Sequence, residues 1–246
     1  MIHIIIGTKA QFIKMAPVMK GLESRGIPYN FVNLGQHGAT VERLERLFET
    51  QDLRLETQDK GEKRDVSSIL GLLKWVLNHL IVISLRPRYL RDSIFKGQGA
   101  VALIHGDTLS TLIGLLMAKR AGLKVAHIES GLRSWNYFHP FPEEIIRAIC
   151  MGFSDYLFAP SDEAVENLKK MEVKGKVFNT GGNTGMDAVR ITLQDLRPKT
   201  EDLSLMSQVS SLKPQVLVSI HRFENLYSRK RFRFILDTVD EVSKRF

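Results

Sequence analysis

Short apolar segments alternate with segments of helical spacing along most of the chain. The first apolar run covers residues 2–6 and is broken by Gly7, and helical spacing then extends from Phe12 to Arg25. Pro17 inside that stretch predicts a kink or a late helix start. Strands that alternate with helices predict a parallel sheet with right-handed crossovers, and wholly apolar strands are typical of a sheet covered on both faces. The chain is therefore predicted to be an α/β protein.

The same pattern locates the other elements. Strands are expected at residues 29–34, 100–104, 124–128, 156–159 and 177–179. Helices are expected at residues 40–48, 66–95, 109–121 and 142–151, with a further helix capped by residues 161–163 and a polar loop after residue 48. Pro142 suits the first turn of its helix, where its missing N–H would have no helical partner.

The pattern changes near residue 190, where the chain becomes polar and rich in turn residues. A last apolar strand at residues 215–220 and a helix at 230–244 follow. One strand and one helix cannot bury a core alone, so we expect this second domain to be incomplete in this chain. The predicted organisation is an N-terminal domain at residues 1–189, a connector at 190–213 and part of a C-terminal domain at 214–246.

Composition narrows the class of protein. Apolar residues make up 43% of the chain, which is typical of a globular protein with a core. Cys150 is the only cysteine, so no intramolecular disulfide is expected and a reducing, cytoplasmic compartment fits. The net charge is +8, but its basic clusters at residues 86–91 and 228–233 accompany no nucleic-acid motif. We expect no nucleic-acid partner; anionic small substrates suit the charge.

Residues 69–85 are apolar enough to raise the question of a membrane segment. Lys74, Asn78 and His79 interrupt the stretch, and its unbroken runs are too short to span a bilayer. We therefore expect no integral membrane segment and a buried or interfacial amphipathic helix instead. The arginines behind it, at residues 86–91, fit a solvated helix end, although anionic headgroups would also suit them.

Two carboxylates lie just after the ends of predicted strands, Asp107 and Glu129. Ligands of parallel sheets bind beyond the carboxyl ends of the strands, which favours these positions over other polar residues. If the two carboxylates share a pocket, mutual repulsion raises the pKa of one of them, as an acid and base pair requires. A helix cap is the alternative for Asp107.

Other polar groups lie at strand ends and helix starts. Glu143 and Glu144 open a helix, where complementing the helix dipole is the simpler role. Gly7 and Thr8 with Lys9 open another, which is a suitable place for a phosphate or carboxylate. The simpler interpretation of Lys9 and Lys14 is that they are ordinary surface lysines.

Two histidines and two carboxylates near two neighbouring strand ends raise the question of a metal site. Neighbouring strand residues point to opposite faces, so convergence on a metal is not expected for His105, Asp107, His127 and Glu129. His221, with Arg222 and Glu224, follows the strand of the second domain. If that domain faces the first, His221 faces Asp107 and Glu129 across a cleft.

Seven motifs, taken in order, resemble the non-hydrolysing UDP-N-acetylglucosamine 2-epimerase family. They are GTKAQFIKMAP at residues 7–17, GQH at 35–37, HGDT at 105–108, HIESGLR at 127–133, PFPEEIIR at 140–147, GNT at 182–184 with Asp187, and HRFEN at 221–225. The resemblance runs from residue 1 to about residue 240. It implies two Rossmann-like domains around a cleft, as in GT-B glycosyltransferases, with the second domain mostly missing here.

The resemblance also implies an activity. The family interconverts UDP-GlcNAc and UDP-ManNAc by elimination and re-addition of UDP, for synthesis of cell-surface polysaccharide precursors. It implies UDP-GlcNAc or related UDP-sugars as ligands, no metal or redox cofactor, and a homodimer. The implied catalytic residues are Asp107, Glu129, Glu143 and His221. The implied substrate-binding residues are Lys9, Lys14, His37, Arg133, Arg147, Asn183 and Arg222.

One departure from the family pattern keeps alternatives open. The family commonly has Gly-Thr-Arg-Pro-Glu where this chain has Gly-Thr-Lys-Ala-Gln at residues 7–11. A lysine cannot make the bidentate contacts of arginine, and Gln11 carries no charge. A related diacetamido or uronic UDP-sugar, a hydrolysing epimerase, and a non-catalytic nucleotide-sugar-binding remnant are the alternatives. A GT-B glycosyltransferase is a further alternative, which rests on fold analogy alone.

Overall fold

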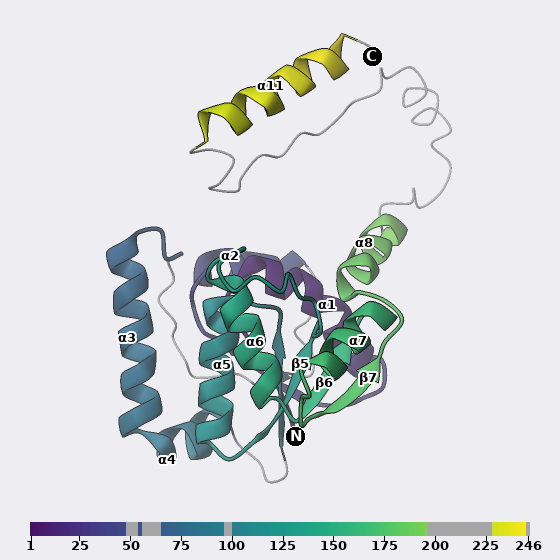
Figure 1. Ribbon diagram of the computed structural model, residues 1–246. Helices are drawn as coiled ribbons and strands as arrows, with labels where there is room; N and C mark the ends of the chain where they lie inside the picture. Colours follow the sequence, from purple (N-terminus) through teal and green to yellow (C-terminus); the bar gives the residue numbers. More distant parts are fainter. Residues whose placement is uncertain (48–53, 56–64, 96–99, 196–227, 245–246) are drawn as a thin grey trace. The chain divides into compact units, whose positions relative to one another are not determined.

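The structure is a computed structural model that describes residues 1–47, 54–55, 65–95, 100–195 and 228–244. The chain forms two compact units, Met1–Asp195 and Leu196–Phe246. The first unit is built on a seven-stranded parallel sheet of order β3-β2-β1-β4-β5-β6-β7 (Figure 1). Its strands are β1 Ile2–Ile6, β2 Tyr29–Asn33, β3 Arg54–Leu55, β4 Val101–His105, β5 Lys124–Ile128, β6 Tyr156–Ala159 and β7 Lys176–Asn179. The predicted α/β class with a parallel sheet is confirmed.

The strand order reverses between β1 and β4, because β2 and β3 lie on one side of β1 and the later strands on the other. Such a switch point opens a crevice at the carboxyl ends of the strands, where ligands of this architecture bind. The sequence prediction missed β3, which pairs with the start of β2 at the edge of the sheet. A strand of two residues carries no periodic signal, so it was expected to be loop.

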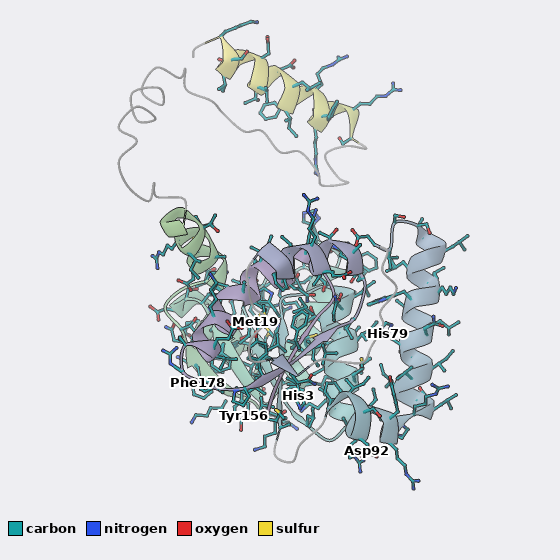
Figure 2. The ribbon with its side chains drawn as sticks, turned by 180° about the vertical axis from the view of Figure 1, so that it is seen from behind. His3, Met19, His79, Asp92, Tyr156 and Phe178 are labelled. Carbon is teal, nitrogen blue, oxygen red and sulfur yellow. The ribbon has the colours of Figure 1, made fainter. Side chains whose placement is uncertain are left out.

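Helices cover both faces of the sheet (Figure 1). On one face, Ile4 and Ile6 pack against α1 and α2; on the other, Ile5 packs against α3, α5 and α6. Figure 2, seen from behind, shows Met19 of α1 over the sheet and His79 on the outer helix α3. The helices are α1 Lys9–Glu23, α2 Gly38–Leu47, α3 Ile69–Leu85, α5 Leu109–Arg120, α6 Glu143–Phe153, α7 Asp162–Lys170 and α8 Thr184–Asp195.

Helix α1 begins at Lys9 and runs through Pro17, so the late start considered for this helix is wrong. A capping box fixes the start: the Thr8 hydroxyl accepts from the Gln11 backbone N–H, and the Gln11 side chain accepts from the Thr8 backbone. These bonds satisfy donors that the first turn of a helix leaves unpaired. The capping bonds set the helix start even though a proline follows two turns later.

The single helix expected at residues 66–95 is wrong, because the chain breaks at Arg86. Helix α3 ends at Leu85, and α4 Pro87–Tyr89 and the π-helical segment η1 Leu90–Ile94 follow. A proline disfavours helical backbone at the residue before it, which explains why the break falls at Arg86, before Pro87. Among the described residues no helix alone has the length and apolarity of a membrane span; α3 and Pro87–Ile94, bent by 92°, meet that criterion only as a pair.

The described part of the second unit is helix α11, Arg229–Ser243, close to the helix expected at residues 230–244. The Ser228 side chain caps it by accepting a hydrogen bond from the Arg231 backbone N–H. The strand expected at residues 215–220, most of the connector at 190–213, and the site residues His221 and Arg222 lie outside the described residues.

Candidate active site

Asp107 and Glu129 follow neighbouring strands at one edge of the sheet. His105, the last residue of β4, pairs in register with Ile128, the last residue of β5. Glu129 adopts a left-handed backbone with φ of 62°, which a residue with a Cβ rarely does. Such a conformation costs about 1–2 kcal/mol and persists only where its surroundings enforce it, which occurs often at functional sites.

The turn after Glu129 requires a glycine at position 131. Gly131 has φ of 89°. A Cβ at this position would lie 2.3 Å from the Ala164 carbonyl oxygen of α7. The Asn167 amide donates to the Gly131 carbonyl at 3.0 Å. The chain is thus packed tightly against α7, which fixes the path of the backbone just beyond Glu129.

The Glu129 carboxylate is held by two side chains, those of Lys14 and Asn183, and lies beside a third, that of His105; we call these residues the Glu129 network. Lys14 of α1 places its Nζ 2.8 and 2.7 Å from the two carboxylate oxygens. The Asn183 amide, just before α8, donates to Oε1, and His105 Nε2 lies 3.3 Å from Oε2. Only 10% of the Glu129 side chain is exposed. These partners come from three separate parts of the chain.

The pKa of Glu129 is lowered, so the expected rise through repulsion is wrong for this residue. Burial on its own raises the pKa of Glu129, but the charge interaction with His105 and the contacts with Lys14 and Asn183 together lower it. Burial lowers the pKa of His105 to about 4. At neutral pH the site therefore presents an ionised carboxylate beside a neutral imidazole.

Asp107 belongs to a second group of side chains, the Glu144 network. Arg147 of α6 donates one N–H to Asp107 and another to Glu144 at 2.9 Å. Arg133 Nε donates to Glu144 at 2.5 Å, and the backbone N–H of Ser134 donates to it at 3.2 Å. The capping alternative for Asp107 is wrong, because Thr108 is the N-cap of α5.

Glu144 does more than complement a helix dipole. Its side chain is fully buried, and the Arg133 side chain is only 2% exposed. Burial raises the pKa of Glu144, but the Arg133 hydrogen bond, the Ser134 N–H and the charges of both arginines lower it. Glu144 thus fixes Arg147, which in turn holds Asp107.

The two strand-end histidines do not form a metal centre with the carboxylates. His127 Nε2 lies 2.7 Å from the Gly106 carbonyl oxygen, and burial lowers the pKa of His127 to about 4. His105 instead lies beside Glu129. Within the described ranges, no group of three or more histidine, cysteine, aspartate or glutamate residues is placed to hold a metal ion.

Other predicted residues lie outside these two networks. Lys9 is exposed at the first position of α1. His37 is half-buried, and its backbone N–H donates to the Gly7 carbonyl at 2.7 Å. The Glu143 side chain has an Oε2 atom that is buried and has no hydrogen-bond partner among the described residues. That unpaired oxygen is the kind of group that a ligand could satisfy.

Sequence reasoning missed two residues of the site, Glu144 and Gln11. Gln11 Oε1 accepts from the backbone N–H groups of Gly7 and Thr8 at 2.9 and 3.1 Å. Those two donors were expected to be available to an anion and are already satisfied. The Thr-x-x-Gln spacing at residues 8–11 is a capping-box signal and could have identified Gln11; nothing in the sequence separates Glu144 from Glu143.

A cavity of about 430 Å³ opens beside Glu129. Apolar side chains of α1 and of three strands line it together with the polar segment before α8. The lining residues are Val18, Leu103, Ile128, Glu129, Phe158, Pro160, Thr180, Gly181, Gly182, Asn183, Thr184, Asp187 and Arg190. Apolar walls with a few polar groups are typical of small-molecule sites.

Comparison with solved structures finds the same fold with ligands bound. UDP-GlcNAc 2-epimerase from Methanocaldococcus jannaschii, in complex with UDP-GlcNAc and UDP, matches with a TM-score of 0.69 and 26% identity, over 99% of this chain and 62% of that one. The Neisseria meningitidis enzyme bound to UDP-GlcNAc matches with a TM-score of 0.64 and 28% identity, over 86% and 55%.

Sequence comparison agrees. UDP-N-acetylglucosamine 2-epimerases from M. jannaschii and Salmonella borreze are 28% and 30% identical to this chain over 98% and 97% of its length. The chain spans 62% and 60% of the length of these two relatives. A sequence profile described as UDP-N-acetylglucosamine 2-epimerase matches residues 88–246. The chain belongs to the UDP-N-acetylglucosamine 2-epimerase family.

Proposed function

We propose that this chain acts as a UDP-N-acetylglucosamine 2-epimerase that interconverts UDP-GlcNAc and UDP-ManNAc. The observation that carries the proposal is the ionised Glu129 carboxylate, held at the end of β5 by Lys14 and Asn183. Asp107 lies beyond the end of the neighbouring strand. Two carboxylates in different settings at one sheet edge are what acid and base chemistry on a sugar needs.

The proposed reaction begins with elimination. One carboxylate removes the C2 proton of UDP-GlcNAc while the C1–O bond to UDP breaks, which leaves a 2-acetamidoglucal and UDP. UDP then adds back to C1, and a proton is delivered to the opposite face of C2. Asp107, Glu129 and Glu143 are the proposed acid and base residues. The buried, unpartnered oxygen of Glu143 supports its inclusion.

The leaving diphosphate needs positive charge. His221 and Arg222 are proposed to supply it, and Lys9, Lys14 and His37 to support the substrate. Asn183 orients Glu129. Arg147 and Arg133 act through the carboxylates that they hold, because the Arg133 side chain is almost fully buried against Glu144. No step in this scheme draws on a metal or redox cofactor.

Product analysis tests the proposal. The chain is incubated with UDP-GlcNAc, and the mixture is followed by ¹H and ³¹P NMR. Formation of UDP-ManNAc from UDP-GlcNAc is the expected result, and incubation with UDP-ManNAc should give UDP-GlcNAc. Free ManNAc with UDP would instead show a hydrolysing epimerase. If UDP-GlcNAc binds in calorimetry but no new sugar forms, the chain is a binding remnant. If UDP-GlcNAc neither binds nor reacts, the proposal that this chain has the family's activity is overturned.

We further propose that the chain is a cytoplasmic homodimer that supplies precursors of cell-surface polysaccharide. Helix α3 supports the dimer, because its outer side carries exposed apolar residues although its inner side already packs on the core. A helix that is apolar all round is normally buried on all sides. The exposed residues are Ile69, Leu70, Leu73, Leu77, Leu80, Ile81 and Leu85.

We propose that a second copy of the chain covers these exposed residues of α3. The helix contains no acidic residue and one lysine, so two copies can meet about a two-fold axis without like charges opposing each other over most of the contact. Light scattering should give twice the chain mass for the parent and the single mass for Leu73→Glu with Leu77→Glu. A monomeric parent, or a parent that binds anionic lipid vesicles through this helix, would contradict the proposal.

A further inference from the structure

Arg133 contacts two aromatic rings of the loop that joins β5 to α6. Its guanidinium carbon lies 4.6 Å from the centre of the Trp135 ring and 5.4 Å from that of the Tyr137 ring. Both distances are within the range of a cation–π contact. The Arg133 side chain is only 2% exposed, whereas Trp135 is 50% exposed. The half-exposed tryptophan thus covers a buried charge instead of filling the hydrophobic core.

The backbone of Trp135 is strained. Its φ is 58°, in the left-handed region that a bulky side chain very rarely adopts. Such a conformation persists only where the surroundings enforce it. The Trp135 N–H donates to Glu144 Oε1 at 3.3 Å, and the N–H of Ser134 before it donates to the same oxygen at 3.2 Å. Successive backbone N–H groups that converge in this way form a nest, which binds anions.

The contacts of Trp135 lead to the reactive strand end. Glu144 Oε1 also accepts from Arg133 Nε at 2.5 Å. The other oxygen of Glu144 accepts from Arg147, which donates to Asp107 as well. We infer that Trp135 is a positioning residue for the proposed epimerisation. Its ring and its N–H hold Arg133 and Glu144 in place, and Arg147 extends that order to Asp107. The inference rests on the proposed function for the reaction and on these contacts for the geometry.

Three substitutions of Trp135 separate positioning from stability. Trp135→Ala removes the ring and keeps a side chain on the strained backbone. Trp135→Gly also removes the ring, but glycine adopts the left-handed region without strain. Trp135→Phe keeps an aromatic face for the guanidinium. Urea unfolding should therefore show a higher midpoint for Trp135→Gly than for Trp135→Ala.

The rates should not follow that order of stability. Exchange of the C2 proton of UDP-GlcNAc per folded molecule should be about tenfold slower in both Trp135→Ala and Trp135→Gly, which is the scale of a small misplacement. The loss should fall on kcat, with KM within about twofold of the parent. Trp135→Phe should restore kcat to within about threefold. A kcat that recovers from alanine to glycine along with stability would reduce Trp135 to a structural role and overturn the inference.

Phe138→Ala is the matched control. Phe138 lies in the same loop and is 80% exposed, and its N–H bond to the Asn136 side chain survives the substitution. Its rate should stay within about twofold of the parent, as for most surface substitutions. Trp75 is the other tryptophan of the chain, so its fluorescence, with circular dichroism, gives the folded fraction of every variant. A loss in Phe138→Ala equal to that in Trp135→Ala would also overturn the inference.

A second readout needs no substrate. The Nε–H of Arg133 is buried and bonded to Glu144, so its proton should exchange slowly with water in the parent. Side-chain ¹⁵N NMR should show exchange at least about tenfold faster in Trp135→Ala and slow exchange in Trp135→Phe. Unchanged exchange in Trp135→Ala would contradict the inference. If the parent turns over no UDP-GlcNAc, the proposed function fails, while the Arg133 exchange still decides whether Trp135 holds the guanidinium.

Discussion

The Glu129 and Glu144 networks both pair a buried carboxylate with cations, yet they differ in how they are built. Glu129 keeps 10% of its side chain exposed and is held by one lysine and one amide, beside a histidine. Glu144 is fully enclosed between two arginines. A closed, charge-balanced pair fits a supporting role, whereas a partly open carboxylate on a left-handed backbone suits chemistry. Asp107, 28% exposed, is bound to the Glu144 network through Arg147.

The largest effect on stability is expected when the closed network is broken. Glu144→Gln removes the charge that balances Arg133, whose side chain is only 2% exposed. Leaving a buried charge without its partner typically costs about 3–5 kcal/mol. Urea unfolding at pH 7 should show that loss. A change below about 1 kcal/mol would mean that the Glu144 network is not the scaffold of the site.

The buried histidines should give a pH dependence of stability. Burial lowers the pKa of His105 and of His127 to about 4, below the ordinary value of 6.5. The unfolded chain therefore binds more protons between these values, so stability falls as pH drops from about 6.5 to 4. The free energy of unfolding should decrease by more than about 1 kcal/mol. His127→Gln should flatten this slope; an unchanged slope would mean that His127 does not contribute.

A smaller stability loss is expected in the open network. Lys14→Met removes two short bonds to Glu129, but Asn183 remains and the Lys14 side chain is 36% exposed. The cost should be about 1.5–3 kcal/mol, the range for a hydrogen bond to a charged group. The pKa of Glu129 should rise at the same time, which ¹³C titration can follow. A loss as large as that of Glu144→Gln would remove the distinction between the two networks.

The smallest effect is expected for an exposed ion pair of similar length. Lys169 and Glu166 lie 2.6 Å apart on α7, with 65% and 57% of their side chains exposed. Solvent-exposed pairs contribute about 0–1 kcal/mol. Glu166→Gln should therefore leave the unfolding free energy unchanged within the error of the urea titration. A larger change would show that proximity alone, without burial, explains the Glu144 result.

The strands could be located from the sequence because each buried strand is an unbroken apolar run. The two-residue strand β3 has no such signature, and the break in the long helix depended on Pro87 rather than on apolar spacing. The placement of Asp107 and Glu129 at one edge followed from strand order. The partners of Glu129 could not be predicted in this way. Lys14 and Asn183 lie 115 and 54 residues from Glu129, and only the folded packing brings them together.

The lowered pKa of Glu129 was also not predictable from the sequence. Two carboxylates at adjacent strand ends suggested repulsion, but each has a cation of its own, Lys14 for Glu129 and Arg147 for Asp107. Pairing of this kind depends on side-chain positions that periodicity does not encode. The roles of the predicted site residues, including His221 and Arg222, remain predictions.

Exchange of the C2 proton of UDP-GlcNAc in deuterated water tests the central claim most directly. The parent chain should incorporate deuterium at C2, as should Glu163→Gln, a surface control on α7. Glu129→Gln and Asp107→Asn should be slower by about 10²–10⁴-fold, the usual contribution of a general acid or base. Exchange at the parent rate in Glu129→Gln would contradict the account, because the carboxylate that Lys14 and Asn183 hold would then have no part in moving the proton.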